Sequence, residues 1–373
     1  MRVVRAHLVN YRNWRTCNVA FAERLTVLVG PNGSGKTNLV ESVYLAAYGR
    51  VLRGKDSDAV RWGEREASAE VRFRADGGTE SIVRARLSAS GKEIAVNGRV
   101  VESRGELVGR FPLVFCSGAD EEIVRGEPEF RRRFLDALGT LVNPEYLPTL
   151  REYLRSVKQR NRLLLQAGQE GLGRVRAGLE AWDEQLVRLG ERLLRKRLRY
   201  LQELEPYFAE FYGKLSGESA EGRLVYLSTV PLGGGEVAEK YRAELARRST
   251  EERLRGMTLV GPHRDDFRIE VAGIDYRRFA SRGQVKLASL ALRLAQATMI
   301  ARARDERPVV VIDDAFSELD DEKAGRALEA LADYQVILAT AEEARVERIL
   351  TTWKEPVGIL RAGGDRIVAE VRP

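Results

Sequence analysis

Gly30-Pro31-Asn32-Gly33-Ser34-Gly35-Lys36-Thr37 is the stretch that decides the fold of this chain. It fits the pattern G-x-x-x-x-G-K-[S/T] of a phosphate-binding loop. The residues before it, Leu25–Val29, are a short apolar run typical of a buried strand, and those after it, Asn38–Leu45, carry apolar side chains at helical spacing. The sequence therefore predicts a strand, a phosphate-binding loop and a helix, in this order.

The composition of this loop suits the phosphates of a nucleotide. Its glycines allow consecutive backbone N–H groups to turn inward, and the N-terminus of the following helix adds a partial positive charge. Lys36 is expected to reach the β- and γ-phosphates, and Thr37 to place its hydroxyl on Mg²⁺. The alternative is a glycine-rich turn that matches by chance, and the length of the motif and the type of its flanks argue against it.

The composition of the whole chain excludes several classes of protein. With 373 residues the chain is long enough for two lobes. No window approaches the roughly 18 apolar residues of a membrane span, and Met1–Arg5 does not lead into a signal-type segment, so we expect a cytoplasmic protein with no membrane partner. The two cysteines, Cys17 and Cys116, are too far apart for a disulfide framework or a zinc site. The formal net charge of +7 suits a polyanion-binding surface but does not establish one.

Strand-like segments surround the loop. Val3–Val9 alternates between apolar and polar residues and is followed by a turn. After the helix, Ala69–Arg74 and Ser81–Leu87 alternate again, and Ile94–Val101 predicts a hairpin with Asn97-Gly98 at its turn. These segments predict an antiparallel sheet beside the nucleotide-binding core.

The middle of the chain, from about Glu129 to Gly213, has helical periodicity. We expect several short helices here with a break at Pro206, and a return helix from Glu236 to Arg255. The fold class is α/β: a P-loop ATPase head with a mixed sheet and an antiparallel β region, which carries an inserted, mostly helical lobe. Residues 1–128 would form the first part of the head, residues 129–253 the helical lobe and residues 254–373 the second part of the head.

Basic residues are frequent in the predicted helical lobe, several of them opposite its apolar seam. The simplest interpretation is a solvated helix face whose charge acidic neighbours balance. Taken together, these cations could also neutralise DNA phosphates and supply sequence-independent, salt-sensitive affinity. The candidate DNA-binding residues are Arg132, Arg133, Arg155, Lys158, Arg160, Arg195 and Lys196.

A second apolar strand supplies the acids that a phosphate-binding loop needs. Pro308–Ile312 is apolar and runs directly into Asp313 and Asp314. Because strand C-termini gather ligands, we expect Asp313 to complete the Mg²⁺ shell and Asp314 to orient or deprotonate the attacking water. Two adjacent carboxylates without a cation would repel each other, which argues against a purely structural role.

A third segment precedes this strand. Ser281 is expected to cap a helix over Val285–Ala303, and with Gly283 it provides a second anion-binding helix start. By itself this is an ordinary capped helix. Its place between the phosphate-binding loop and the acidic strand makes it a candidate nucleotide contact.

Together these motifs resemble ATP-binding-cassette (ABC) ATPase heads of the SMC type, and among them the RecF family of bacterial DNA replication and repair proteins. The likeness rests on Asn32 and Asn38 in the loop region, on Ser281-x-Gly283-Gln284, and on Ser317-Glu318-Leu319-Asp320 after the acidic strand. Further motifs of the family are Leu8–Asn13, Arg131–Asp136, Lys158–Asn161, Gly261–Asp266 and Asp313–Asp320. They follow the family order over nearly the whole chain.

The resemblance implies cofactors and partners. The head would bind ATP with Mg²⁺, form an ATP-dependent homodimer, and bind gapped or junction DNA in the dimer cleft. Each ATP would lie between the loop of one subunit and the signature helix of the other, so Ser281 and Gly283 would contact the γ-phosphate of the partner and Asp320 would lie at the dimer seam. RecF-like proteins act with RecO and RecR to help load RecA.

The resemblance also implies a set of site residues. Lys36 and Asp314 would be catalytic, and Thr37 and Asp313 would bind the metal. The nucleotide-binding residues would be Gly30, Pro31, Asn32, Gly33, Ser34, Gly35, Lys36, Thr37 and Asn38, together with Arg12, Ser281, Gly283, Gln284 and Asp320.

Four positions depart from the family pattern. Cys116–Glu121 stands where the family has a Pro-Glu-Asp-Leu-like loop, and Val285-Lys286 replaces the Gln-Arg that commonly follows the signature. Thr340 takes the place of the switch histidine of ABC transporters. Asp314 stands where many ABC ATPases carry glutamate, and its shorter side chain would misplace the water by on the order of 1 Å. We therefore expect a weak, DNA-stimulated ATPase that acts as a switch.

Two alternative functions share some of these features. The nucleotide-binding subunit of a membrane transporter has the same three motifs, but it requires a switch histidine and a coupling surface. An ATPase-coupled nuclease requires an appended catalytic domain, and no residues remain after the head to form one.

The motif Gly261–Asp266 contains a histidine whose role the sequence leaves open. A lone histidine such as His263 is more often a structural hydrogen-bonding group than a catalyst. Arg264 could pair with Asp265 or Asp266, or reach DNA or phosphate.

Overall fold

The computed structural model describes residues 1–170, 172–218, 221–316, 319–363 and 366–372. The chain forms two compact units. The first contains Met1–Glu121, Tyr207–Ala220 and Ser281–Pro373, and the second contains Glu122–Pro206 and Glu221–Ala280.

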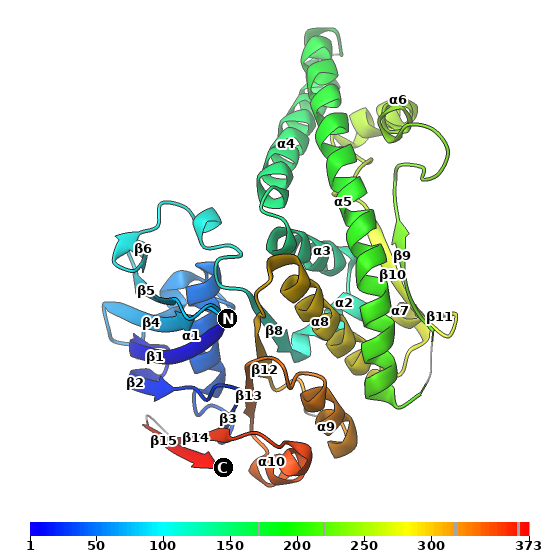
Figure 1. Cartoon of the computed structure of the whole chain (residues 1–373). Coiled ribbons are helices and arrows are strands. Elements are labelled where there is room, and N and C mark those ends of the chain that lie inside the picture. Colours follow the sequence, from blue (N-terminus) through cyan, green and yellow to red (C-terminus); the bar gives the residue numbers. More distant parts are fainter. Residues whose placement is uncertain (171, 219–220, 317–318, 364–365, 373) are drawn as a thin grey trace. The chain divides into compact units, whose positions relative to one another are not determined.

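The first unit is built on a six-stranded sheet with the order β15-β14-β3-β13-β12-β8 (Figure 1). Its strands are β3 (Leu25–Val29), β8 (Leu113–Ser117), β12 (Val309–Asp313), β13 (Val336–Thr340), β14 (Val357–Gly363) and β15 (Arg366–Arg372). Neighbouring strands are parallel except β14 and β15, which are antiparallel. β3 and β12 are buried along their whole length, as parallel strands covered on both faces are. Their carboxyl ends therefore lie at one edge of the sheet.

A second sheet of the first unit, β2-β1-β4-β5-β6-β7, is antiparallel throughout. Its strands are β1 (Arg2–Tyr11), β2 (Trp14–Ala20), β4 (Glu66–Arg74), β5 (Glu80–Ser88), β6 (Gly91–Val96) and β7 (Arg99–Val100). Asn97 and Gly98 both have positive φ at the β6–β7 turn, which is the backbone of a type I′ hairpin. The predicted antiparallel region is confirmed.

Helix α1 (Lys36–Tyr48) lies between these two sheets, with contacts to β1, β4 and β5 on one side and to β13, β12 and β8 on the other. Leu39, Val40 and Val43 are fully buried in the core that it shares with both sheets. The other helices of the unit are α8 (Arg282–Arg304), α9 (Asp321–Glu329) and α10 (Glu343–Ile349), with short 3₁₀ turns at Asp56–Ala59, Arg104–Glu106, Gly118–Asp120 and Leu350–Thr352. The phosphate-binding loop is thus held by a helix with little freedom to move.

The second unit is mostly helical. Its helices are α2 (Glu121–Arg125), α3 (Pro128–Val142), α4 (Tyr146–Glu170), α6 (Val237–Arg255), α7 (Tyr276–Phe279), a 3₁₀ turn at Leu172–Arg174, and α5 (Arg176–Ser216) as far as Pro206. It also contains a small antiparallel sheet of β9 (Gly222–Leu227), β10 (Asp266–Val271) and β11 (Ile274–Asp275). Figure 1 shows α4 and α5 side by side, and ion pairs such as Arg160–Asp183 join them.

The prediction that Pro206 ends a helix is wrong. α5 continues through it to Ser216, with a length of 41 residues, so the expectation of short helices also fails. A proline removes one backbone N–H and disfavours the preceding turn. Here the buried side chains of Leu204 and Phe208 on either side of the proline stabilise the helix through packing.

The boundaries of the two units differ from the expected segments 1–128, 129–253 and 254–373. Residues 207–220 belong to the first unit, where Tyr207 stacks against the Arg302 guanidinium at 5.0 Å. Residues 254–280 belong to the second, because β10 pairs with β9 along its whole length and contacts α3. Pairing between distant strands leaves no local sequence signal, and so the boundaries were misplaced.

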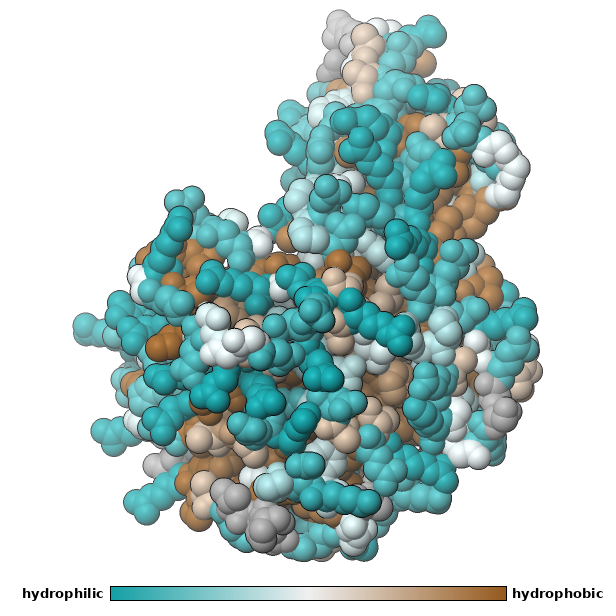
Figure 2. All heavy atoms as spheres, viewed as in Figure 1, coloured by the Kyte–Doolittle hydropathy of each residue, from teal (hydrophilic) through white to brown (hydrophobic). Residues whose placement is uncertain are grey.

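The surface is largely hydrophilic on the face seen in Figure 2, with apolar residues in small groups. Among the described helices, none has a stretch long and apolar enough to cross a lipid bilayer.

Candidate functional site

The loop Gly30–Thr37 joins the carboxyl end of β3 to α1, as predicted. Gly33 and Gly35 have φ of 82° and 97°, in the region that favours glycine. A Cβ atom on Gly35 would lie 2.7 Å from the ring of Trp14 and 2.6 Å from the side-chain nitrogen of Asn13. Only glycine therefore fits this position, and the loop backbone is held tightly against β2.

The N-terminus of α1 lacks a side-chain cap, because its N-cap residue is Gly35, and its first turn carries no acidic residue. Backbone N–H groups at such a helix start attract an external anion. The Ser34 hydroxyl beside them is buried and has no hydrogen-bond partner among the described residues. A buried polar group of this kind calls for a partner. Both observations fit a bound phosphate group.

Lys36 lies inside the loop. Its Nζ donates to the carbonyl oxygens of Gly30 at 2.7 Å and Pro31 at 2.9 Å. Burial lowers the pKa of Lys36, and the charges of Asp314 and Asp313 oppose this effect. The ammonium is therefore held among carbonyl dipoles at the centre of the loop, where the charge of a phosphate would compensate for its lost hydration.

Thr37 and Asp313 meet although 276 positions separate them in the chain. The Thr37 hydroxyl donates to Asp313 Oδ1 at 3.0 Å. Burial raises the pKa of the Asp313 carboxyl, while the bond from Thr37 and the charge of Arg53 lower it. Arg53 Nη2 lies 3.5 Å from Asp313 Oδ2. A hydroxyl and a buried carboxylate at this spacing are oxygen ligands of the kind that Mg²⁺ takes.

Asp314 follows directly at the end of β12 and is exposed. Its φ of 57° lies in the left-handed region, which aspartate and asparagine tolerate better than most residues. Its backbone N–H donates to the Ala339 carbonyl at 3.0 Å, which fixes this geometry. The second carboxylate is thereby exposed, directly after the buried Asp313 that contacts Thr37.

The signature segment starts α8, and the predicted cap is confirmed. The Ser281 hydroxyl accepts from the Gln284 N–H at 3.3 Å, and Gln284 Oε1 accepts from the Ser281 N–H at 2.8 Å. These residues are exposed, and a Cβ on Gly283 would meet no atom within 4 Å. The structure gives them no hydrogen bond to the loop Gly30–Thr37 among the residues it describes.

Asp320 caps the N-terminus of α9. Its Oδ1 accepts from the Lys323 N–H at 2.8 Å, and its Oδ2 lies 2.6 Å from Lys323 Nζ. These bonds lower the pKa of the Asp320 carboxyl. The preceding motif residues Ser317 and Glu318 lie outside the described part of the chain.

Arg12 is placed beside α1. Its Nε and Nη2 donate to the two carboxylate oxygens of Glu41 at 3.0 and 2.9 Å. The same guanidinium donates to the carbonyl oxygens of Arg53 and Asp58, both at 2.8 Å. Arg12 thus connects the segment after α1 to the helix. Its hydrogen bonds among the described residues hold the local structure together.

The interpretation of Arg160 as a DNA-binding residue is wrong. Its side chain is 3% exposed and pairs with Asp183 and Glu252, while Nη1 donates to the Thr258 hydroxyl at 3.0 Å. A basic residue on the inner face of a helix looks the same in sequence as one on its outer face. Arg160 therefore joins α4, α5 and α6 inside the second unit.

The other candidate DNA-binding residues lie closer to solvent. Arg132 is half-buried and donates to the Asp265 carbonyl at 2.9 Å. Three others form ion pairs with acidic neighbours at the surface: Arg133, Arg195 and Lys196. Arg155 and Lys158 are exposed.

His263 is a structural group, in agreement with the favoured interpretation. Nδ1 lies 2.7 Å from the Tyr153 hydroxyl and Nε2 3.1 Å from the Thr258 carbonyl oxygen. Burial lowers the pKa of His263 to about 4, which the nearby arginines reinforce. Arg264 donates to the same Thr258 carbonyl at 3.0 Å. The imidazole is thus neutral and fastens α4 to the chain before β10.

The loop at Cys116–Glu121 holds a group that the sequence analysis missed. Asp120 is buried, accepts from the Ser117 N–H at 2.9 Å and pairs with Arg293 of α8. The β8–β12 register puts Ser117 opposite Asp313. The loop thus links the strand beside the acidic pair to the signature helix. An acid followed much later by an arginine leaves no pattern that sequence reasoning could detect.

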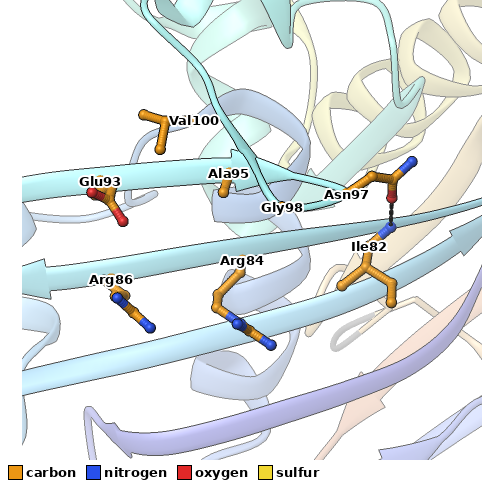
Figure 3. A pocket seen from close by; sticks show the side chains of 8 residues that line it. All are labelled: Ile82, Arg84, Arg86, Glu93, Ala95, Asn97, Gly98 and Val100. Atoms are coloured by element: carbon orange, nitrogen blue, oxygen red, sulfur yellow. Dashed lines mark hydrogen bonds between the residues drawn. The ribbon is translucent and has the colours of Figure 1, made fainter.

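A shallow groove of about 320 Å³ lies on the antiparallel sheet (Figure 3). Its lining residues are Ile82, Arg84, Arg86, Glu93, Ala95, Asn97, Gly98 and Val100. The residues that alternate with them on β5, Val83, Ala85 and Leu87, are buried in the core with α1. The groove therefore opens on the opposite face of the sheet and is no part of the candidate nucleotide site.

A family model described as RecF/RecN/SMC N terminal domain matches residues 2–361 of the chain. The protein named DNA replication and repair protein RecF of Thermosynechococcus vestitus is 34% identical over 368 residues, which cover 97% of this chain and 96% of that protein. The chain belongs to the RecF family. The RecF of Desulforudis audaxviator is 37% identical over 348 residues, covering 92% and 94%. Membership in the RecF family gives a role in DNA replication and repair, and it does not favour the transporter subunit.

Solved structures agree with this assignment to the RecF family. The recombination mediator protein RecF with ATP, in the RecFOR pathway, has a TM-score of 0.87 at 29% identity, covering 99% of this chain and 97% of that one. An SMC head bound to the C-winged helix domain of ScpA has a TM-score of 0.60 at 16% identity and shows the fold alone. The predicted fold, an ABC/SMC-type ATPase head with a mostly helical second part, is confirmed.

Proposed function

We propose that this chain is an ATP-dependent DNA-binding protein of recombinational repair and replication-fork maintenance, in which ATP joins two copies around DNA. The observation that carries the proposal is the contact of Thr37 with Asp313 beside Lys36, in a chain of the RecF family. A relative of known structure that covers nearly the whole chain holds ATP, which supports the choice of nucleotide.

The phosphate-binding loop supplies one half of the nucleotide site. The uncapped start of α1 and the Ser34 hydroxyl would receive phosphate oxygens, and Lys36 would exchange its two carbonyl acceptors for the β- and γ-phosphates. Thr37 and Asp313 would hold Mg²⁺, which offsets the burial of the Asp313 carboxylate. When bound there, Mg²⁺ would supply positive charge against the negative charge that develops on the transferred phosphoryl group.

The second copy of the chain would supply the other half. Ser281, Gly283 and Gln284 form an exposed start of a 23-residue helix, with free space around Gly283. Such a helix end suits the γ-phosphate of a nucleotide bound by the partner copy. Asp320 would lie at the same seam. The nucleotide would then act as a latch that requires two copies.

Asp314 would activate the attacking water as a general base. Its side chain is one methylene shorter than the glutamate that many ABC ATPases carry, so turnover would be slow. A slow ATPase suits a protein whose task is to hold DNA for a time, with hydrolysis as the reset.

The basic residues of the second unit would contact the DNA backbone, with Arg133, Arg155, Lys158, Arg195 and Lys196 as the candidates and Arg132 at their margin. The DNA would be a gapped duplex or a junction of single and double strands. RecO- and RecR-like mediators would join there and promote the loading of RecA.

Sedimentation of the full chain with a gapped duplex tests this function. With ATP, the wild type should form a dimer that retains DNA, and Lys36→Met should remain a monomer because the β- and γ-phosphates lose their cation. Lys214→Met is the matched control, since Lys214 is an exposed lysine that pairs with Glu210. A wild-type dimer that forms equally without ATP, or no dimer with ATP and DNA, would contradict the proposal.

A further inference from the structure

Trp62 is 98% exposed, which is unusual for the largest apolar side chain. Its backbone is nonetheless well held. The Glu64 N–H donates to the Arg61 carbonyl at 3.0 Å, and Gly63 has φ of 85°, so the indole stands at the tip of a tight turn. The Arg61 N–H donates in turn to the Asn10 carbonyl at 2.8 Å. A rigid turn thus presents a bare aromatic ring to solvent.

Short contacts connect this turn to the phosphate-binding loop. Arg61 Nη1 donates to the Asn13 carbonyl at 2.9 Å, and Asn38 Nδ2 donates to Asn13 Oδ1 at 2.7 Å. The Asn13 side chain also lies against Gly35, where no Cβ would fit. Trp62 is therefore anchored, through Arg61 and Asn13, to the first turn of α1.

The loop fixes where the phosphates of a nucleotide would lie. Lys36 marks the β- and γ-phosphate end, and Thr37 with Asp313 marks the metal between them. Asn38, the next residue, lies in the first turn of α1, and its Nδ2 donates to Asn13 Oδ1. Arg61 contacts Asn13 as well, so the turn that carries Trp62 lies beside the end of α1 that would receive the phosphates.

We propose that the Trp62 indole stacks on the purine base of the nucleotide bound in the loop of the same copy. This inference rests on the proposed function, and it adds the group that recognises the base. An aromatic ring offers a π-face to any base, and such stacking accounts for about a tenfold change in affinity or more when the ring is removed. The Arg61 guanidinium donates to the Asn13 carbonyl and so holds the turn, while the exposed indole stays open to the base.

The test compares Trp62→Ala and Trp62→Phe with the wild type, each as the full chain. Equilibrium affinity is measured for ATP and for inorganic tripolyphosphate, which carries the same phosphates without a base. Trp62→Ala should weaken ATP binding about tenfold, leave tripolyphosphate binding unchanged, and be rescued largely by Trp62→Phe. Because the side chain is exposed, neither variant should alter the thermal midpoint.

Intrinsic fluorescence gives a second readout that does not depend on turnover. ATP should quench the wild type, tripolyphosphate should not, and Trp62→Phe should abolish the quench. Trp182→Phe is the control for the loss of another incompletely buried indole.

Several results would overturn the proposal. The first is that Trp62→Ala loses affinity equally for ATP and tripolyphosphate, and the second is that it loses affinity for neither. The third is a loss of affinity for single-stranded DNA alone, which would assign the indole to DNA. Failure of the proposed function appears elsewhere: Lys36→Met would then bind ATP and tripolyphosphate as the wild type does.

Discussion

Asp314 has a left-handed backbone conformation at the point where β12 ends. Asp313, its neighbour, points to Thr37 from a buried strand, while Asp314 is exposed. One reversal of the backbone thus gives two adjacent carboxylates different surroundings. In the proposed function, this difference would let Asp313 hold a metal ion and Asp314 receive a proton from water.

The substitution Asp314→Asn tests the proposed role of Asp314 as the base, because it replaces one carboxylate oxygen by an amide nitrogen. Asparagine tolerates the left-handed conformation as aspartate does, so the fold and the ATP affinity should stay unchanged. Loss of the base should slow ATP hydrolysis about 10²-fold or more and lengthen the lifetime of the ATP-bound dimer.

Phosphate release and dimer dissociation after dilution measure the two effects. Asp333→Asn, a change at an exposed acid elsewhere in the first unit, is the control. An unchanged dimer lifetime in Asp314→Asn would show that this carboxylate is not the base.

At the scale of elements, α4 and α6 are joined by polar groups rather than by an apolar seam alone. Arg160 connects Asp183 and Glu252, and His263 connects Tyr153 to the Thr258 carbonyl. Each of these bonds is buried or half-buried, and breaking one would leave an unpaired polar group inside the unit. Because one of the groups, His263, can take up a proton, the stability of this unit should depend on pH.

His263 gives that dependence a sign. Its pKa falls from 6.5 to about 4 in the folded chain, so below pH 6.5 the unfolded chain takes up a proton that the folded chain refuses. Stability should be complete above pH 6.5 and fall as the pH drops toward 4, by about 2 kcal/mol at pH 5.

Urea unfolding at pH 7 and pH 5 measures this loss. His263→Gln, which keeps a hydrogen-bonding side chain, should show a smaller change between the two pH values than the wild type. His7→Gln removes the other histidine and should behave as the wild type does. A pH response equal in wild type and His263→Gln would rule out this source.

Local patterns predicted the elements that hold the site, and long-range contacts decided the rest. The loop Gly30–Thr37, its strand and helix, and the cap at Ser281 follow from neighbouring residues, and they were placed correctly. The burial of Arg160 depends on acids from two other helices, and the helix through Pro206 depends on packing on either side. Arg53 reaches Asp313 from a polar stretch with no periodicity. None of these is encoded within a short window of sequence.

At the scale of the whole molecule, the candidate nucleotide-binding residues and the candidate DNA-binding residues belong to different units. The phosphate-binding loop and its acids belong to the first unit, and all candidate DNA contacts belong to the second. DNA affinity and nucleotide affinity should therefore respond to different substitutions.

Salt dependence separates the two. With ATP, retention of the wild type on a gapped duplex should fall steeply as salt rises, with the logarithm of affinity linear in the logarithm of salt concentration. Lys158→Ala should reduce the slope by about 1, because one exposed cation that contacts phosphate is lost. Lys214→Ala should leave the slope unchanged. A slope that does not change in Lys158→Ala would remove this residue from the DNA contacts.

The order of strands in the central sheet also governs when the site can form. β3 emerges early from the ribosome, but its neighbours β13 and β14 are synthesised much later. The nascent chain must therefore carry an unpaired apolar strand while the helical unit is made. The contact between Thr37 and Asp313 spans 276 positions and therefore forms among the last steps, after the residues of the helical unit have been synthesised.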